Sequence, residues 1–212
     1  MSTGTRTSLS LFDVIGVPVF VGWFIWRGQF SAPFSWLGFP IRLVASFLLH
    51  RDTPKTLGMR ADNFLPATKQ PMIIFGVFSV AVFVIGVVLG QPLHPPPNYR
   101  SLGRVWAYFA FCLTQQIGLN SLLTNRLVSL IKTRWLACSL AGAIFAVLHW
   151  PNPVLVLLTL IGGTAMAWMF ARERHILPLA VGQALPGSLA WRAFPIAWHH
   201  MLRVGPGYYS QY

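Results

Sequence analysis

The sequence predicts an all-α fold, a polytopic transmembrane helical bundle of about seven spans with a polar intramembrane cavity. Three observations support this fold class. Of the 212 residues, 55% are hydrophobic and only 9% are charged, which is typical of a multi-pass membrane protein. Apolar segments long enough to cross a bilayer recur along the whole chain. The cations lie mostly between these segments, where they set the orientation of the chain.

The candidate spans, in chain order, are residues 9–26, 34–50, 71–90, 105–123, 135–150, 153–170 and 176–191. The second is the weakest, because Pro40 and Arg42 interrupt it, and a tilted or interfacial helix is the alternative. The fourth is expected to continue to Ile131 as a helix that leaves the membrane. Residues 94–98, which include three prolines, predict a stiff extended loop. The chain thus divides into N-terminal membrane segments (1–55), a transmembrane core (56–191) and a C-terminal interfacial tail (192–212).

The loop cations predict a cytoplasmic N-terminus, and the first span is expected to be retained because no cleavage site follows it. A cell membrane is expected because the sequence shows no organelle signal. Contact with anionic headgroups of the lipid bilayer suits the excess of sixteen Lys and Arg over four acidic residues, and no nucleic-acid partner is expected. The cytoplasmic side would hold Arg6, Arg51, Lys55, Arg60, Lys69, Arg126, Lys132, Arg134, Arg172 and Arg174, and the opposite side Arg27, Arg100, Arg104, Arg192 and Arg203.

A polar stretch interrupts the fourth span. Gln115, Gln116 and Asn120 are amides inside an apolar segment, and such groups are costly in a membrane unless another protein group satisfies them. Gln116 and Asn120 are four residues apart and therefore share one helix face. We expect all three side chains to point into the protein interior, and the clearest partners are His149 and Gln183 from later spans.

Three short motifs follow one another in a fixed order: Gln115-Gln116-x-x-x-Asn120, then Phe145-x-x-x-His149 with Trp150-Pro151-Asn152-Pro153 directly after it, and finally Gln183 in the last span. The order and spacing resemble the CPBP intramembrane protease family, which includes the type II CAAX prenyl endopeptidases. That family carries Glu-Glu-x-x-x-Arg, Phe-x-x-x-His and His-x-x-x-Asn or Asp at these places. The resemblance covers roughly residues 56–186.

The resemblance implies a helical bundle with a cavity that opens within the membrane, and an endopeptidase that acts on membrane-bound or prenylated peptides. In the family a glutamate activates water, histidines and an asparagine stabilise the oxyanion, and a metal role has been proposed. Here Gln115 and Gln116 replace both glutamates, and Gln183 replaces one histidine. A glutamine amide cannot accept a proton as a general base, and it is a poor metal ligand beside carboxylate or imidazole.

Two functions remain open at this stage. The first is an intramembrane endopeptidase with altered or weak catalysis, in which the catalytic positions are Gln115, Gln116, Asn120, His149 and Gln183. The second is a non-catalytic pseudoprotease that binds a lipid, an isoprenoid or a peptide in the membrane. The glutamines equally fit interhelical hydrogen bonds, each worth about 0.5–2 kcal/mol. A transporter or channel is disfavoured, because charged pathway residues and paired broken helices are missing from this core.

The remaining titratable residues leave further alternatives. His149 is expected to line the cavity, although a buried structural histidine is the alternative, and alone it is not a metal site. His199 and His200 are expected in an interfacial segment, with a replacement catalytic or metal pair as the alternative. Asp13 and Arg42 fall inside spans, where they could pair or each snorkel to an interface. No cofactor is expected.

Overall fold

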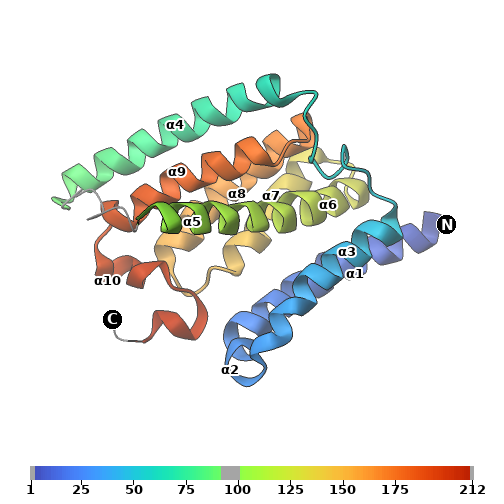
Figure 1. The fold of residues 1–212 in the computed structure, drawn as a ribbon, viewed down its shortest axis with the longest axis horizontal. Helices are drawn as coiled ribbons and strands as arrows, with labels where there is room; N and C mark the ends of the chain where they lie inside the picture. The colour runs from blue at the N-terminus through green and yellow to red at the C-terminus, as the bar shows by residue number, and fades with distance from the viewer. Residues whose placement is uncertain (1–2, 92–100, 211–212) are drawn as a thin grey trace.

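The computed structural model describes residues 3–91 and 101–210, and all the regular elements in these ranges are helices. The long helices run roughly alongside one another (Figure 1), which confirms the predicted all-α fold class. Three helical segments are long and apolar enough to cross a membrane, namely Gly4–Ser31, Phe64–Val88 and Pro153–Glu173, and Arg134–Val147 is a shorter apolar helix. The number of seven spans stays a prediction. The proline-rich segment 94–98 lies outside the described residues.

The N-terminal part of the chain forms a helical hairpin. Helix α1 (Thr3–Trp23) continues through a π-helical turn, η1 (Phe24–Gly28), into α2 (Gln29–Ser31), and α3 (Gly38–His50) returns beside α1 (Figure 1). Pro40 lies in the first turn of α3, where a proline is tolerated because the missing N–H would have no partner within the helix. Thus the interrupted second segment is helical throughout, first as a short 3-10 helix, η2 (Pro33–Leu37), and then as α3.

The central bundle contains the remaining long helices. They are α4 (Phe64–Val88), α5 (Ser101–Gln116), α7 (Arg134–Val147), α8 (Pro153–Glu173) and α9 (Leu177–Ala193). Helix α5 passes through a π-helical segment, η3 (Ile117–Thr124), into α6 (Asn125–Leu130), so the predicted continuation toward Ile131 is present. Side chains from these helices, including Phe75, Phe145 and Phe170, form the main apolar core.

Helices α7 and α8 form a tight antiparallel hairpin, and the Trp150–Pro153 motif makes the turn. The Asn152 side chain caps α8, because its Oδ1 accepts a hydrogen bond from Leu155 N at 3.1 Å, and Pro153 occupies the first turn. A Cβ atom on Gly142 would lie 2.6 Å from the backbone nitrogen of Thr164. Glycine at this position therefore permits the close approach of the two helix backbones.

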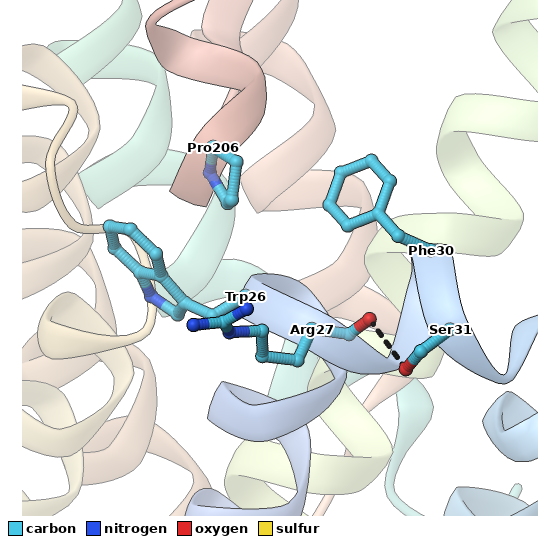
Figure 2. A pocket seen from close by; sticks show the side chains of 5 residues that line it. All are labelled: Trp26, Arg27, Phe30, Ser31 and Pro206. Carbon is cyan, nitrogen blue, oxygen red and sulfur yellow. Dashed lines mark hydrogen bonds between the residues drawn. The ribbon is translucent and has the colours of Figure 1, made fainter.

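The C-terminal residues fold back onto the α7–α8 turn. Asn152 Nδ2 donates to the carbonyl oxygens of His199, the last residue of α10 (Ile196–His199), at 2.6 Å and of Arg203 at 3.0 Å. Gly205 N donates to Trp150 O at 3.0 Å. These bonds fix the tail at the end of the bundle that also carries α2, so that Pro206 faces the side chains of Trp26 and Phe30 (Figure 2).

His175 lies in the short α8–α9 connection, outside the predicted spans, and is only 5% exposed. Its ring packs edge-on against Phe64, with centroids 5.5 Å apart. Burial lowers the pKa of His175 below 6.5, and the nearby Arg60 guanidinium lowers it further.

This lowered pKa predicts a pH-dependent stability. The unfolded chain takes up a proton near pH 6.5, whereas folded His175 resists protonation, so the unfolding free energy should be full above pH 6.5 and decline as the pH falls below it. Unfolding of the detergent-solubilised protein at pH 7.5 and 5.5 checks this. We expect a smaller difference between the two pH values in His175→Phe, and an unchanged difference would contradict the assignment.

Candidate functional site

Four amide side chains meet in the interior of the bundle, and we call Gln115, Gln116, Asn120 and Gln183 the amide cluster. Gln183 Nε2 donates to Gln115 Oε1 at 2.6 Å, and Gln116 Nε2 donates to Gln183 Oε1 at 2.6 Å. Asn120 Nδ2 donates to Gln116 Oε1 at 2.5 Å, and Asn120 Oδ1 accepts from Thr124 Oγ1 at 3.1 Å. The hydrogen bonds thus form one continuous chain from α9 to η3.

The positions of helices α5 and α9 explain how one residue serves both glutamines. A side chain at Gly187 would overlap the Tyr108 hydroxyl, so the glycine permits α9 to lie close to α5. The carboxamide of Gln183 then uses its Nε2 toward Gln115 and its Oε1 toward Gln116. The two neighbouring glutamines therefore reach one partner although they point in different directions from their helix.

The amide cluster is neutral, and every amide nitrogen and oxygen of its innermost members has a hydrogen-bond partner. Gln116 and Asn120 are fully buried, with 0% exposure, whereas Gln115 and Gln183 are half-buried. Gln116 Nε2 also approaches Met166 Sδ at 2.8 Å, so both of its ends have partners. An amide neither gains nor loses a proton near neutral pH. The cluster can hold helices together and donate or accept hydrogen bonds, but it cannot take a proton from water.

His149 lies just beyond the end of α7, and its side chain is hydrogen-bonded to a backbone carbonyl of the last turn of that helix. Its Nδ1 lies 2.7 Å from Phe145 O, and its ring packs edge-on against the Phe145 ring with centroids 4.7 Å apart. Because a carbonyl oxygen only accepts, Nδ1 carries a proton, and in the neutral imidazole Nε2 then keeps a lone pair. Within residues 3–91 and 101–210, none of the hydrogen bonds of the amide cluster reaches His149. Of the two expected partners, Gln183 is therefore hydrogen-bonded to the glutamines, and His149 has no hydrogen bond to them among the described residues.

Metal-binding side chains do not gather in the described part of the chain, where no group of three or more His, Cys, Asp or Glu residues could hold an ion. His199 and His200 have different surroundings. His199 is fully buried, and its Nδ1 accepts a hydrogen bond from Leu202 N at 3.2 Å. The His200 ring stacks on Tyr208 with centroids 3.9 Å apart. Both histidines thus pack within the folded tail.

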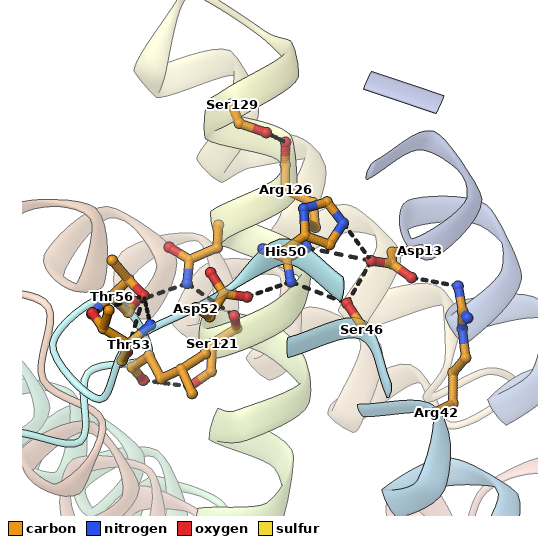
Figure 3. A network of polar contacts seen from close by, with 12 residues as sticks. Asp13, Arg42, Ser46, His50, Asp52, Thr53, Thr56, Ser121, Arg126 and Ser129 are labelled. Carbon is orange, nitrogen blue, oxygen red and sulfur yellow. Dashed lines mark hydrogen bonds and ion pairs between the residues drawn. The ribbon is translucent and has the colours of Figure 1, made fainter. Parts of the chain in front are cut away.

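A second polar site, which the motifs do not predict, joins the N-terminal hairpin to α6 (Figure 3). Asp13 Oδ1 pairs with Arg42 Nη2 at 2.5 Å, and Asp13 Oδ2 lies 3.3 Å from Arg126 Nε. Arg126 Nη2 also pairs with Asp52 Oδ2 at 2.6 Å. We call this the ionic cluster, and its members are Asp13, Arg42, Ser46, His50, Asp52 and Arg126.

The ionic cluster decides one alternative that the sequence left open. Asp13 and Arg42 pair with each other instead of each reaching an interface. Arg126, which the sequence places among the loop cations, is buried and 4% exposed. The physical reason is that the carboxylates of Asp13 and Asp52 need a compensating charge at this depth. The signal in the sequence that could have indicated this contact was an acidic residue inside one span, Asp13, together with a cation directly after another span, Arg126.

Long apolar helices, an interior amide cluster and a buried ionic cluster define a multi-pass helical membrane protein. Residues 97–185 match the family model for type II CAAX prenyl endopeptidases, described as Rce1-like. The matched range contains the whole amide cluster and His149, and it confirms the resemblance that the motif order indicates. The search of curated proteins found no match, and neither did the search of solved structures.

Proposed function

We propose that this chain is a non-catalytic relative of the CAAX prenyl endopeptidases, a pseudoprotease that binds a lipid, an isoprenoid or a peptide within the membrane. The transmembrane core would be residues 56–191, in a cell membrane, with the N-terminus in the cytoplasm. The observation that carries the proposal is the chain of neutral, mutually bonded amides at Gln183, Gln116 and Asn120. Gln116, with its neighbour Gln115, occupies a position at which the family pattern has a glutamate, and Gln183 occupies the position of a histidine.

The chemistry of the amide cluster supports binding in place of hydrolysis. Peptide hydrolysis needs a group that removes a proton from water near working pH, and a positioned base typically contributes about 10²–10⁴-fold to the rate. Gln116 and Asn120 have no such group and no exposed surface. At the half-buried end of the cluster, Gln115 Oε1 accepts from Gln183, while its Nε2 has no hydrogen-bond partner among residues 3–91 and 101–210. This N–H group is free to donate to a ligand carbonyl.

The family match favours a second function, an endopeptidase with altered catalysis. In that mechanism His149 would be the base, because its Nε2 holds a lone pair while Nδ1 is bonded to Phe145 O. The imidazole would take a proton from water, and amides of the cluster would stabilise the oxyanion. This function requires cleavage that depends on His149, and the pseudoprotease does not.

Peptide cleavage distinguishes the two functions. The purified protein in liposomes is given farnesylated and unmodified peptide reporters, beside His149→Ala and the triple variant Gln115→Glu/Gln116→Glu/Gln183→His. We expect equal background rates for the parent and His149→Ala, and a rate at least about 100-fold higher for the triple variant, because the carboxylates restore a base. Gln183→His is included because an imidazole can donate a hydrogen bond to the new carboxylate at position 116. Gln183 would instead present its Oε1 to that carboxylate, and two acceptor oxygens repel each other.

Cleavage by the parent that disappears in His149→Ala would overturn the proposal and establish the second function. If neither the parent nor any variant cleaves the reporters, a binding measurement tests the proposal. A photoreactive farnesylated peptide should crosslink to the parent protein and be displaced by unlabelled peptide or isoprenoid. Absence of both cleavage and displaceable crosslinking would reject ligand binding at this site, and the amide cluster would then only hold α5 and α9 together.

A further inference from the structure

A cavity of about 530 Å³ lies at the end of the bundle that carries α2 and the C-terminal tail. None of the residues of the amide cluster lines it. It opens between the end of the first helical segment and the tail (Figure 2). The lining residues combine one cation, two aromatic rings and two small polar or cyclic side chains, namely Arg27, Trp26, Phe30, Ser31 and Pro206.

Among residues 3–91 and 101–210, no side-chain carboxylate forms an ion pair with Arg27. The sequence has four Asp and Glu residues, which are Asp13, Asp52, Asp62 and Glu173. Asp13 and Asp52 meet in the ionic cluster. Asp62 precedes α4 and pairs with Arg60, and Glu173 O accepts from Asn63 beside it. All four therefore lie toward the end of the α3–α4 connection, whereas Arg27 is exposed at the opposite end.

The cavity is formed before any ligand arrives, because the tail is fixed. Gly205 has φ 55°, a left-handed conformation that favours glycine. A Cβ atom there would lie 2.6 Å from Ile25 Cγ2, so the tail backbone rests directly on the end of the first helical segment. The Gly205 N to Trp150 O hydrogen bond holds it from the other side. Pro206 is thereby held opposite Trp26 and Phe30.

We propose that this cavity binds the phosphate of an anionic phospholipid headgroup. The guanidinium of Arg27 has five N–H donors in a planar fork that suits two phosphate oxygens at once. Trp26 and Phe30 are 39% and 66% exposed, and such rings lie at the level of headgroups, where they contact the glycerol and the first carbons of the acyl chains. The helical segment Gly4–Ser31 is apolar and long enough to span, so its end at Ser31 falls at this level. The site does not depend on the proposed function.

Lipid retention measured by native mass spectrometry tests the site. The intact protein is released from detergent with equal amounts of phosphatidylglycerol and phosphatidylcholine, and bound lipid is titrated. We expect preferential binding of phosphatidylglycerol, and about a ten- to hundredfold weaker affinity in Arg27→Gln, because a charge-assisted phosphate contact is lost. Arg192→Gln is the matched control, since it removes the same charge from the end of α9 and does not line the cavity.

Equal loss in Arg27→Gln and Arg192→Gln would overturn the site, because it would indicate a diffuse attraction of the whole end for anions. Equal retention of the two lipids would overturn it as well. Titration with inorganic phosphate separates the sources of the ligand: displacement of phosphatidylglycerol by low millimolar phosphate would reject the lipid and indicate a free anion. Matching unfolding temperatures of the three proteins show that the comparison concerns folded chains.

Discussion

Arg126→Ala should lower the free energy of unfolding by about 3–5 kcal/mol, the cost of removing one partner from a buried charge network. Arg126 contacts Asp13 at 3.3 Å and Asp52 at 2.6 Å, and it also donates to Ser46 Oγ at 3.0 Å. After the substitution Asp52 loses its pairing partner, and Asp13 keeps Arg42 and His50. Unfolding of the purified protein by a denaturing detergent measures the effect.

Arg172→Ala is the matched control, because Arg172 is exposed near the end of α8 and its loss should change the unfolding free energy by less than about 1 kcal/mol. A double-mutant cycle with Asp13→Asn adds a sharper test. The two residues are in contact, so the double variant should lose less than the sum of the single losses. Equal losses for Arg126→Ala and Arg172→Ala would show that the ionic cluster does not hold the hairpin to the bundle.

Gly142→Ala should destabilise the protein by about 1–3 kcal/mol, the typical cost of inserting a methyl group into a closely packed contact. The added Cβ would meet the backbone of Thr164 across the α7–α8 contact, 2.6 Å from its nitrogen and 2.9 Å from its Cα. Backbone atoms cannot rotate away, so the two helices must separate. Their separation would also displace Met166, which contacts Gln116 in the amide cluster.

The control for this substitution is Gly162→Ala on the partner helix. A Cβ atom there meets nothing within 4 Å, and replacing a helical glycine by alanine should leave the unfolding free energy unchanged or raise it by up to about 1 kcal/mol. The two variants add the same methyl group to the same helical hairpin. If they change stability equally, the close approach at Gly142 is not what the hairpin depends on.

The sequence by itself predicted that Gln116 and Asn120 share a helix face and that Gln183 is a partner. Few polar residues lie inside the membrane spans, so a buried amide has few possible partners. The spacing within one helix and the small number of polar residues in the other spans were therefore sufficient to predict these contacts. Spacing did not reveal that Gln183 bonds Gln115 and Gln116 at the same time, because the double contact depends on the distance between α5 and α9 and on the length of the side chains. Spacing also did not reveal that His149 is bonded to Phe145 O and not to the amide cluster.

Composition and hydropathy also determined the all-α fold and the apolar helices, because these follow from local patterns of residues. Only the tertiary structure decided which charges meet. Arg126 follows a span and reads as a loop cation, yet it is buried between Asp13 and Asp52, residues that lie far from it in the chain. The Arg27 cavity likewise exists because the tail returns to the first helical segment. Both are long-range contacts, set by packing between helices rather than by the residues next to each group.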